Sequence, residues 1–167
     1  MILDQFDEQG LSQAGFTGFL TIAELSSDRA RIPAVRGVYA VLRTVTSEPE
    51  FTQIGSGGHF KGKDPNVEIA DLQRNWVPGA QVVYIGKAGD PGRAATLRSR
   101  LWQYLRFGEG ANVGHWGGRY IWQLADRDSL IIAWNEMPDG VPSELESELI
   151  GRFRGHFGER PFANLAK

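Results

Sequence analysis

One stretch of the chain carries tyrosine, lysine and arginine side chains at spacings that suit phosphate chemistry. Residues 82–85 (VVYI) form an apolar, largely β-branched run that is typical of a buried strand. Leucines then recur every fourth residue from Leu97, the spacing of a helix with one buried face. Arg100 and Tyr104 are also four residues apart, so they point to one side of that helix, beside the leucines.

Positive charge is concentrated in the same stretch. Asp90 is its one acidic residue, in an Asp-Pro-Gly sequence that predicts a turn between the strand and the helix. The basic residues of the stretch are Lys87, Arg93, Arg98, Arg100 and Arg106. Such a concentration favours binding of phosphate, without indicating which phosphate.

The composition excludes several kinds of site. With 167 residues, 41% of them hydrophobic, the chain is expected to form one domain over residues 1–167. Because it contains no cysteine, disulfides, thiolate zinc sites and cysteine nucleophiles are excluded. The net charge of −2 does not by itself indicate a nucleic-acid-binding protein, but the uneven distribution of charge permits a local basic face.

The first ten residues, MILDQFDEQG, lack the basic start and apolar core of a signal peptide. No segment approaches the length of a membrane span. The expected location is therefore the cytoplasm, with no membrane partner.

The pattern of the whole chain predicts a small α/β domain of the α+β type. Three strand-like runs are expected to form a mixed or antiparallel sheet, flanked by helices: residues 35–42, 82–85 and 130–134. An N-terminal arm with a short helix over 19–25 occupies residues 1–30. Glycine and proline break residues 47–78 into a long inserted loop between the first two core strands, with one short helix near 67–72.

Two tripeptides resemble the paired signature of the GIY-YIG nuclease superfamily. They are residues 37–39 (GVY) and 84–86 (YIG), which lie on the first two predicted core strands. Gly37 and Gly86 stand at the glycine positions of the signature, and the resemblance implies a structural role for both beside the site.

The residues that follow resemble the catalytic domain of UvrC-type repair nucleases in type and order. Lys87 directly follows the second tripeptide, Arg100 stands at the family's catalytic arginine, and Tyr104 follows one helical turn later. Glu146, shortly before a Leu-Ile pair, resembles the family's metal-binding glutamate. Asn164 resembles its terminal asparagine.

The chain also departs from the family pattern. Residues 40–83 separate the two tripeptides by much more than is usual in the family. The glycine-rich segment 114–119 (GHWGGR) has no assigned counterpart, although His115 resembles a histidine of homing-type relatives and is a secondary candidate.

The resemblance implies that Glu146 is the one protein ligand of Mg²⁺ or Mn²⁺, hard cations that keep water ligands. Spacing alone leaves an alternative open. Ser143 stands three residues earlier, where it could cap the helix and pair with Glu146 in a capping box. The family pattern favours the metal.

Tyr39 is implied to be the general base that takes a proton from the attacking water, with Tyr84 beside it. A phenol with a pKa near 10 needs nearby positive charge for this role, which Lys87 and the cation would supply. The alternative is that both tyrosines simply end buried strands with satisfied hydroxyl groups.

Arg100 is implied to clamp the scissile phosphate through its planar guanidinium. Tyr104 either orients the water or the base, or packs. Asn164 is expected to tie the C-terminal turn near the site. The expected nucleic-acid contacts are Arg98, His115, Arg119, Lys61 and Lys63.

Together these residues predict a metal-dependent endonuclease or nickase that hydrolyses DNA phosphodiester bonds in duplex or branched substrates. A homodimer is plausible for cleavage of both strands. The alternative is a non-catalytic module that keeps the fold and binds nucleic acid or a protein.

Overall fold

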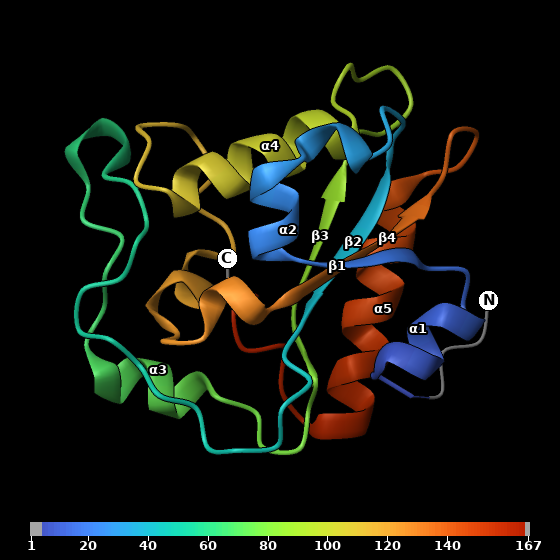
Figure 1. Ribbon diagram of the computed structural model, residues 1–167. Helices are drawn as coiled ribbons and strands as arrows, with labels where there is room; N and C mark the ends of the chain where they lie inside the picture. Colours follow the sequence, from blue (N-terminus) through green and yellow to red (C-terminus); the bar gives the residue numbers. More distant parts are fainter. Residues whose placement is uncertain (1–4, 166–167) are drawn as a thin grey trace.

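The computed structural model describes residues 5–165, in which helices cover both faces of a four-stranded antiparallel sheet (Figure 1). The strands lie in the order β1-β4-β2-β3. Their bounds are β1 Thr17–Thr21, β2 Gly37–Leu42, β3 Val82–Ala88 and β4 Ile131–Glu136. The α+β class agrees with the sequence, and β2, β3 and β4 are the three predicted strands.

The fourth strand, β1, is a correction to the three-stranded prediction. The predicted N-terminal arm, residues 1–30, begins outside the described range and contains α1 Glu8–Gln13, β1 and α2 Ile22–Ser27. Residues 19–25 were predicted as one helix, but the helix starts only after Thr21, which caps it in a capping box with Glu24. Gly18 and Phe19 have positive φ angles and form a β-bulge in β1. The bulge breaks the regular alternation of inward and outward side chains by which the strand could have been predicted from the sequence.

Each face of the sheet packs against its own layer of helices (Figure 1). α2 and α4 Leu97–Gly108 cover one face, and α1 and α5 Pro142–Phe157 cover the other. Side chains of the central strand β2 alternate between the two cores, so that Tyr39 faces α4 while Val38 and Ala40 face α5. This alternation places Tyr39 on the α4 side, where the basic helix lies.

The insertion is an ordered part of the structure. It contains α3 Ile69–Asn75, close to the predicted short helix, and runs along the left side of Figure 1. The buried side chain of Gln123 holds it: its Nε2 donates to Thr52 O at 3.1 Å and to Val67 O at 2.9 Å, and its Oε1 accepts from Val67 N at 2.9 Å. An isolated bridge joins Phe51 to Leu124.

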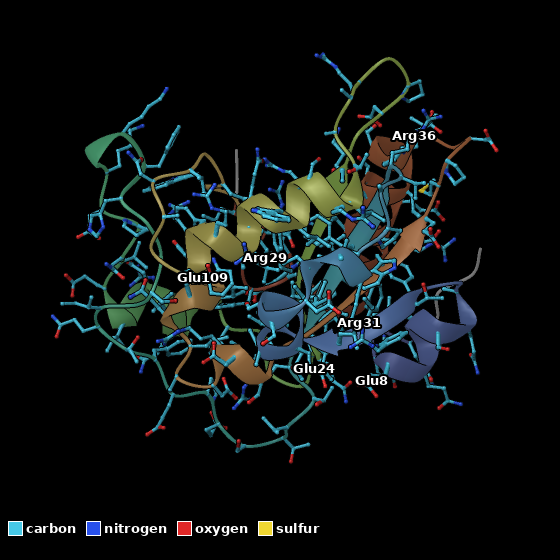
Figure 2. The ribbon with its side chains drawn as sticks, turned by 45° about the horizontal axis from the view of Figure 1, so that its top comes forward. Glu8, Glu24, Arg29, Arg31, Arg36 and Glu109 are labelled. Carbon is cyan, nitrogen blue, oxygen red and sulfur yellow. The ribbon has the colours of Figure 1, made fainter. Side chains whose placement is uncertain are left out.

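Two ties fasten the segment after α2 to α4. Arg29 forms an ion pair with Glu109 at the C-terminal end of α4 (Figure 2). Arg98, in the first turn of α4, donates from Nε to Ile32 O at 2.7 Å and from Nη2 to Ala30 O at 3.1 Å. The guanidinium of Arg98 is thus used inside the fold.

Residues 163 and 164, near the C-terminal end of the described chain, hydrogen-bond to the free edge of β3. Asn164 accepts a hydrogen bond from Ile85 N at 2.9 Å through Oδ1 and donates to Ile85 O at 2.8 Å through Nδ2. Ala163 N donates to Val83 O at 2.8 Å. The amide of Asn164 therefore takes the place of a neighbouring strand and ties the C-terminal turn to β3.

Among the described helices, none is both long enough and apolar enough to cross a bilayer.

Replacing Asn164 with alanine is expected to lower the free energy of unfolding by about 1–3 kcal/mol, because it leaves the N–H and C=O of Ile85 without partners. Urea denaturation followed by circular dichroism measures the change. Asn112→Ala is the control, since the Asn112 side chain accepts one exposed N–H, from Lys61, and its removal should change stability by less than about 0.5 kcal/mol. Equal losses in the two variants would contradict the role of Asn164.

Candidate active site

A large open cleft lies along β3, between α4, α5 and the segment 116–120. Its volume is about 1500 Å³. The lining includes predicted site residues from six separate parts of the chain: Tyr39, Tyr84, Lys87, Arg100, Arg119, Glu146 and Asn164. Side chains that are more than 100 residues apart in the sequence therefore share one wall of solvent-accessible space.

Strand register brings the two signature tyrosines together. Tyr39 is paired with Gly86 in the antiparallel β2–β3 ladder, and its ring lies across that glycine. A Cβ on Gly86 would lie 2.4 Å from Cζ of Tyr39, so only glycine fits there. Gly37 is constrained in the same way, since a Cβ would lie 2.2 Å from the carbonyl oxygen of Asn135. At both positions the close packing leaves no room for a side chain.

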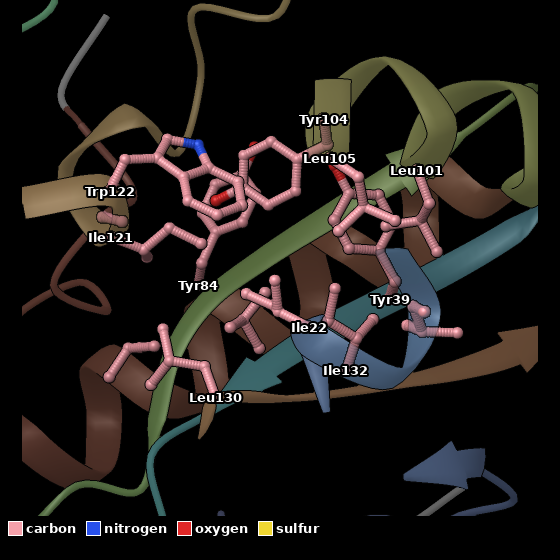
Figure 3. Close-up of a cluster of buried hydrophobic side chains, with 14 of the residues drawn as sticks. Ile22, Tyr39, Tyr84, Leu101, Tyr104, Leu105, Ile121, Trp122, Leu130 and Ile132 are labelled. Carbon is pink, nitrogen blue, oxygen red and sulfur yellow. The ribbon is translucent and has the colours of Figure 1, made fainter. Parts of the chain in front are cut away.

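Behind the cleft the tyrosines form an aromatic cluster with Tyr104 of α4. The rings of Tyr84 and Tyr104 are 5.6 Å apart, and Trp122 packs against Tyr104 at 5.2 Å (Figure 3). Tyr39 completes the cluster, with its centroid 6.0 Å from that of Tyr84. This packing fixes the positions of the phenol groups.

His115 is hydrogen-bonded to Tyr39 inside the protein. Its Nδ1 is 3.1 Å from the carbonyl oxygen of Gly117, which can only accept, so Nδ1 carries the proton. The unprotonated Nε2 therefore accepts from the hydroxyl of Tyr39, at 3.3 Å. His115 is fully buried. The sequence predicts that His115 contacts nucleic acid directly, but the structure buries its side chain against Tyr39.

Burial controls the protonation of this pair. It raises the pKa of Tyr39 well above 10, and Tyr84 adds to the effect, while the charge of Arg100 acts in the opposite direction. Burial, followed by the charge of Arg100, lowers the pKa of His115 to about 3. At neutral pH the pair therefore consists of a neutral phenol that donates to a neutral imidazole.

Lys87, which the sequence predicts to supply positive charge to Tyr39, lines the cleft and has a carboxylate partner there. Its ammonium group forms an ion pair with Asp90 in the turn after β3. The other carboxylate oxygen of Asp90 accepts from Ser143 N at 2.9 Å. Lys87 and then this backbone bond lower the pKa of Asp90 to about 2. Asp90 thereby links the β3–α4 turn to the start of α5, a role for which its turn-forming sequence gave no signal.

The capping-box alternative for Glu146 is not found. α5 begins at Pro142 with Val141 as its N-cap, and no side chain of its own caps it. Asp90 supplies the cap from another part of the chain. Glu146 is half-buried and lines the cleft, and its charge contributes, after burial, to the raised pKa of Tyr39 and of Tyr84.

The carboxylate of Glu146 is the group of the cleft that could hold a cation. Within residues 5–165, no group of three or more histidine, aspartate or glutamate side chains gathers to enclose a metal. A single carboxylate in an open cleft suits Mg²⁺ or Mn²⁺, because Mg²⁺ dehydrates reluctantly and is commonly bound by one or two carboxylates together with substrate phosphate. Glu146 is the residue that would hold it.

Arg100 and Tyr104 have different environments although they are one turn apart on α4. Arg100 is half-buried in the cleft, where its Nη1 donates to Gln103 Oε1 at 3.2 Å. Tyr104 is fully buried, and its hydroxyl donates to the carbonyl oxygen of Gly118 at 2.7 Å. Its ring is 4.3 Å from that of His115. Tyr104 therefore positions the His115 segment and does not reach the cleft.

The cleft is basic although the chain as a whole is acidic. Its described lining contains six basic side chains and two carboxylates, in a chain with a net charge of −2. The basic residues are Lys87, Arg93, Arg100, Arg119, Arg154 and Arg160, and the carboxylates are Asp90 and Glu146. Arg154 and Arg160 were not predicted as site residues, because nothing in the linear sequence places them beside β3.

Three of the expected nucleic-acid contacts lie elsewhere. Arg98 is bonded to backbone carbonyl groups of the segment after α2, as described above. Lys61 and Lys63 are exposed on the insertion and are not part of the cleft lining. Of that group, Arg119 lines the cleft.

No protein-family model, curated protein or solved structure matches this chain. Any assignment of function therefore depends on the arrangement of these side chains.

The buried imidazole predicts a pH dependence of stability. In the unfolded chain His115 has a pKa of about 6.5, so below that pH the unfolded state binds a proton that the folded state excludes down to about pH 3. The free energy of unfolding should therefore fall as the pH is lowered from 6.5 towards 3, by up to about 1.4 kcal/mol per pH unit from this group. His115→Gln should remove that component, as measured by urea denaturation at each pH.

The exposed His156 provides the control, because His156→Gln should keep the full decline. If His115→Gln showed the same pH profile as the parent, His115 would not be a buried neutral group.

Proposed function

We propose that this protein is a metal-dependent endonuclease that nicks DNA, with an active site of the GIY-YIG type. The observation that carries the proposal is the convergence of Tyr39 with its His115 partner, Arg100 and Glu146 on one basic cleft. The size and openness of the cleft support a polymeric substrate, since pockets for small ligands are usually about 300–1,000 Å³.

The guanidinium of Arg100 binds the scissile phosphate. Its planar donors match two phosphate oxygens, and its half-buried position strengthens the interaction relative to water. Arg93, Arg154 and Arg160, which also line the cleft, hold the flanking phosphates. Glu146 would hold the divalent cation, which when bound would polarise the phosphate and stabilise the leaving oxygen.

Tyr39 and His115 form the path by which the attacking water loses its proton. The phenol oxygen of Tyr39 accepts the proton of the water, while its own proton passes to Nε2 of His115. The pKa values of the substrate-free protein oppose this transfer, since burial keeps Tyr39 protonated and His115 neutral. A phosphate against Arg100 offsets the positive charge that disfavours protonation of His115, so binding of substrate favours the relay.

Loss of the Glu146 carboxylate should abolish cleavage while the fold is kept. We expect the parent protein to nick supercoiled plasmid in Mg²⁺ or Mn²⁺ and Glu146→Gln, or the parent in EDTA, to leave it intact. Glu148→Gln is the matched control, because Glu148 is exposed on the same helix and pairs with Arg152. Undiminished nicking by a folded Glu146→Gln variant would refute the metal assignment.

Arg100→Ala should lower kcat about 10²–10³-fold, the usual effect of removing one preorganised donor to the transition state. Arg106→Ala, at an exposed position on the same helix, should leave kcat within a factor of about two. Single-turnover cleavage of a labelled oligonucleotide measures both. Similar losses in the two variants would mean that charge in general, and not Arg100, supports the reaction.

Nicking is the activity that one copy of the site supports. Cleavage of both strands of a duplex would need two such sites, which a homodimer would supply.

A second candidate, a module that binds without catalysis, is favoured by the 1% exposure of Tyr39 and its raised pKa. Binding to nucleic acid would then weaken steeply with salt, because it depends on phosphate contacts, whereas binding to a protein through an apolar patch would not. Salt-dependent binding of DNA without cleavage of any DNA form would favour this candidate over the nuclease.

A further inference from the structure

The segment with no assigned counterpart in the sequence resemblance forms one wall of the cleft. Trp116 and Arg119 line it, together with the two glycines between them. The proposed chemistry uses His115 from this segment, but it gives no role to the tryptophan and the arginine.

Arg119 lies against two aromatic rings, and part of its hydrogen-bonding capacity is unused. Its guanidinium carbon is 4.6 Å from the ring centroid of Trp116 and 5.4 Å from that of Tyr120. Nη1 donates to Trp116 O at a long 3.4 Å, and the buried Nε has no partner among the described residues. Burial lowers the pKa of Arg119. A partly desolvated guanidinium is costly unless the N–H groups that face the cleft find acceptors there.

The rest of the structure holds this pair in place from behind. The edge-on ring of Phe107 packs against Trp116, with centroids 6.2 Å apart and planes at 79°. Gly118 has a φ of 76°, and a Cβ there would lie 2.6 Å from the hydroxyl of Tyr104. The hydroxyl of Tyr104 also donates a hydrogen bond to Gly118 O, which restrains this turn. The indole is therefore presented to the cleft on a rigid turn.

We propose that Trp116 and Arg119 form a subsite for one unpaired nucleobase next to the scissile phosphate. This inference rests on the proposed function, in which the substrate is nucleic acid. Aromatic rings and guanidinium planes are the surfaces on which unstacked bases pack. A base inside a duplex already has both faces stacked, so the subsite selects a strand with an unpaired or extruded nucleotide.

The test compares two labelled duplex oligonucleotides that differ at one bulged position, which carries either a base or an abasic sugar. Fluorescence anisotropy in EDTA gives the dissociation constants without cleavage. The parent protein is expected to bind the bulged base about 5- to 150-fold more tightly than the abasic bulge, the equivalent of ~1–3 kcal/mol for one stacked base.

Variants locate the preference. Trp116→Leu should bind both oligonucleotides equally, while Trp116→Tyr, which keeps an aromatic face, should retain most of the preference. Trp102→Leu is the control, because Trp102 is exposed on α4 and is not part of the cleft lining, and it should behave as the parent.

Equal affinities of the parent protein for the two oligonucleotides would overturn the subsite and leave the proposed nuclease intact. A preference that survives in Trp116→Leu would also overturn it. Absence of binding to every form of DNA would instead overturn the proposed function, and the subsite with it.

Discussion

Tyr39 lies across Gly86, its partner in the antiparallel ladder of β2 and β3, and no side chain fits between them. This close approach fixes where the phenol of Tyr39 points. It places Tyr39 beside Tyr84, beneath α4, and within hydrogen-bonding distance of His115 from a loop more than 70 residues away. The aromatic cluster, the buried imidazole and the wall of the cleft all depend on Gly86 in β3.

The charges of the site are arranged around that neutral, buried pair. Arg100 lies close enough to influence the pKa of Tyr39, Tyr84 and His115, and Glu146 raises the pKa of both tyrosines from the opposite helix. Asp90 holds the start of α5 by bonding Ser143 N, and it pairs with Lys87 at the same time. One aspartate in a turn therefore sets the position of the helix that carries Glu146 relative to β3.

The sequence predicted the elements whose pattern is local and missed features that depend on contacts between distant residues. The apolar runs of β2, β3 and β4 and the leucine repeat of α4 have one clear period each, and all four elements are present. β1 was missed because positive φ angles at Gly18 and Phe19 interrupt its alternation.

The same limit applies to the site. The types and order of Tyr39, Arg100 and Glu146 were enough to expect them together, and they line one cleft. Burial could not be deduced for His115, since a histidine among glycines carries no periodic signal. Arg98 follows Leu97 on the same helix as Arg100, but a difference of two residues turns it towards the carbonyl groups of Ile32 and Ala30.

Anomalous X-ray diffraction from crystals grown with Mn²⁺ and a short oligonucleotide tests directly whether Glu146 and Arg100 act on one phosphate. The proposed active site predicts a manganese peak in the cleft, bonded to the carboxylate of Glu146 and to a phosphate oxygen that also contacts Arg100. Manganese bound by other carboxylates, with the oligonucleotide in the cleft and no metal at Glu146, would contradict it.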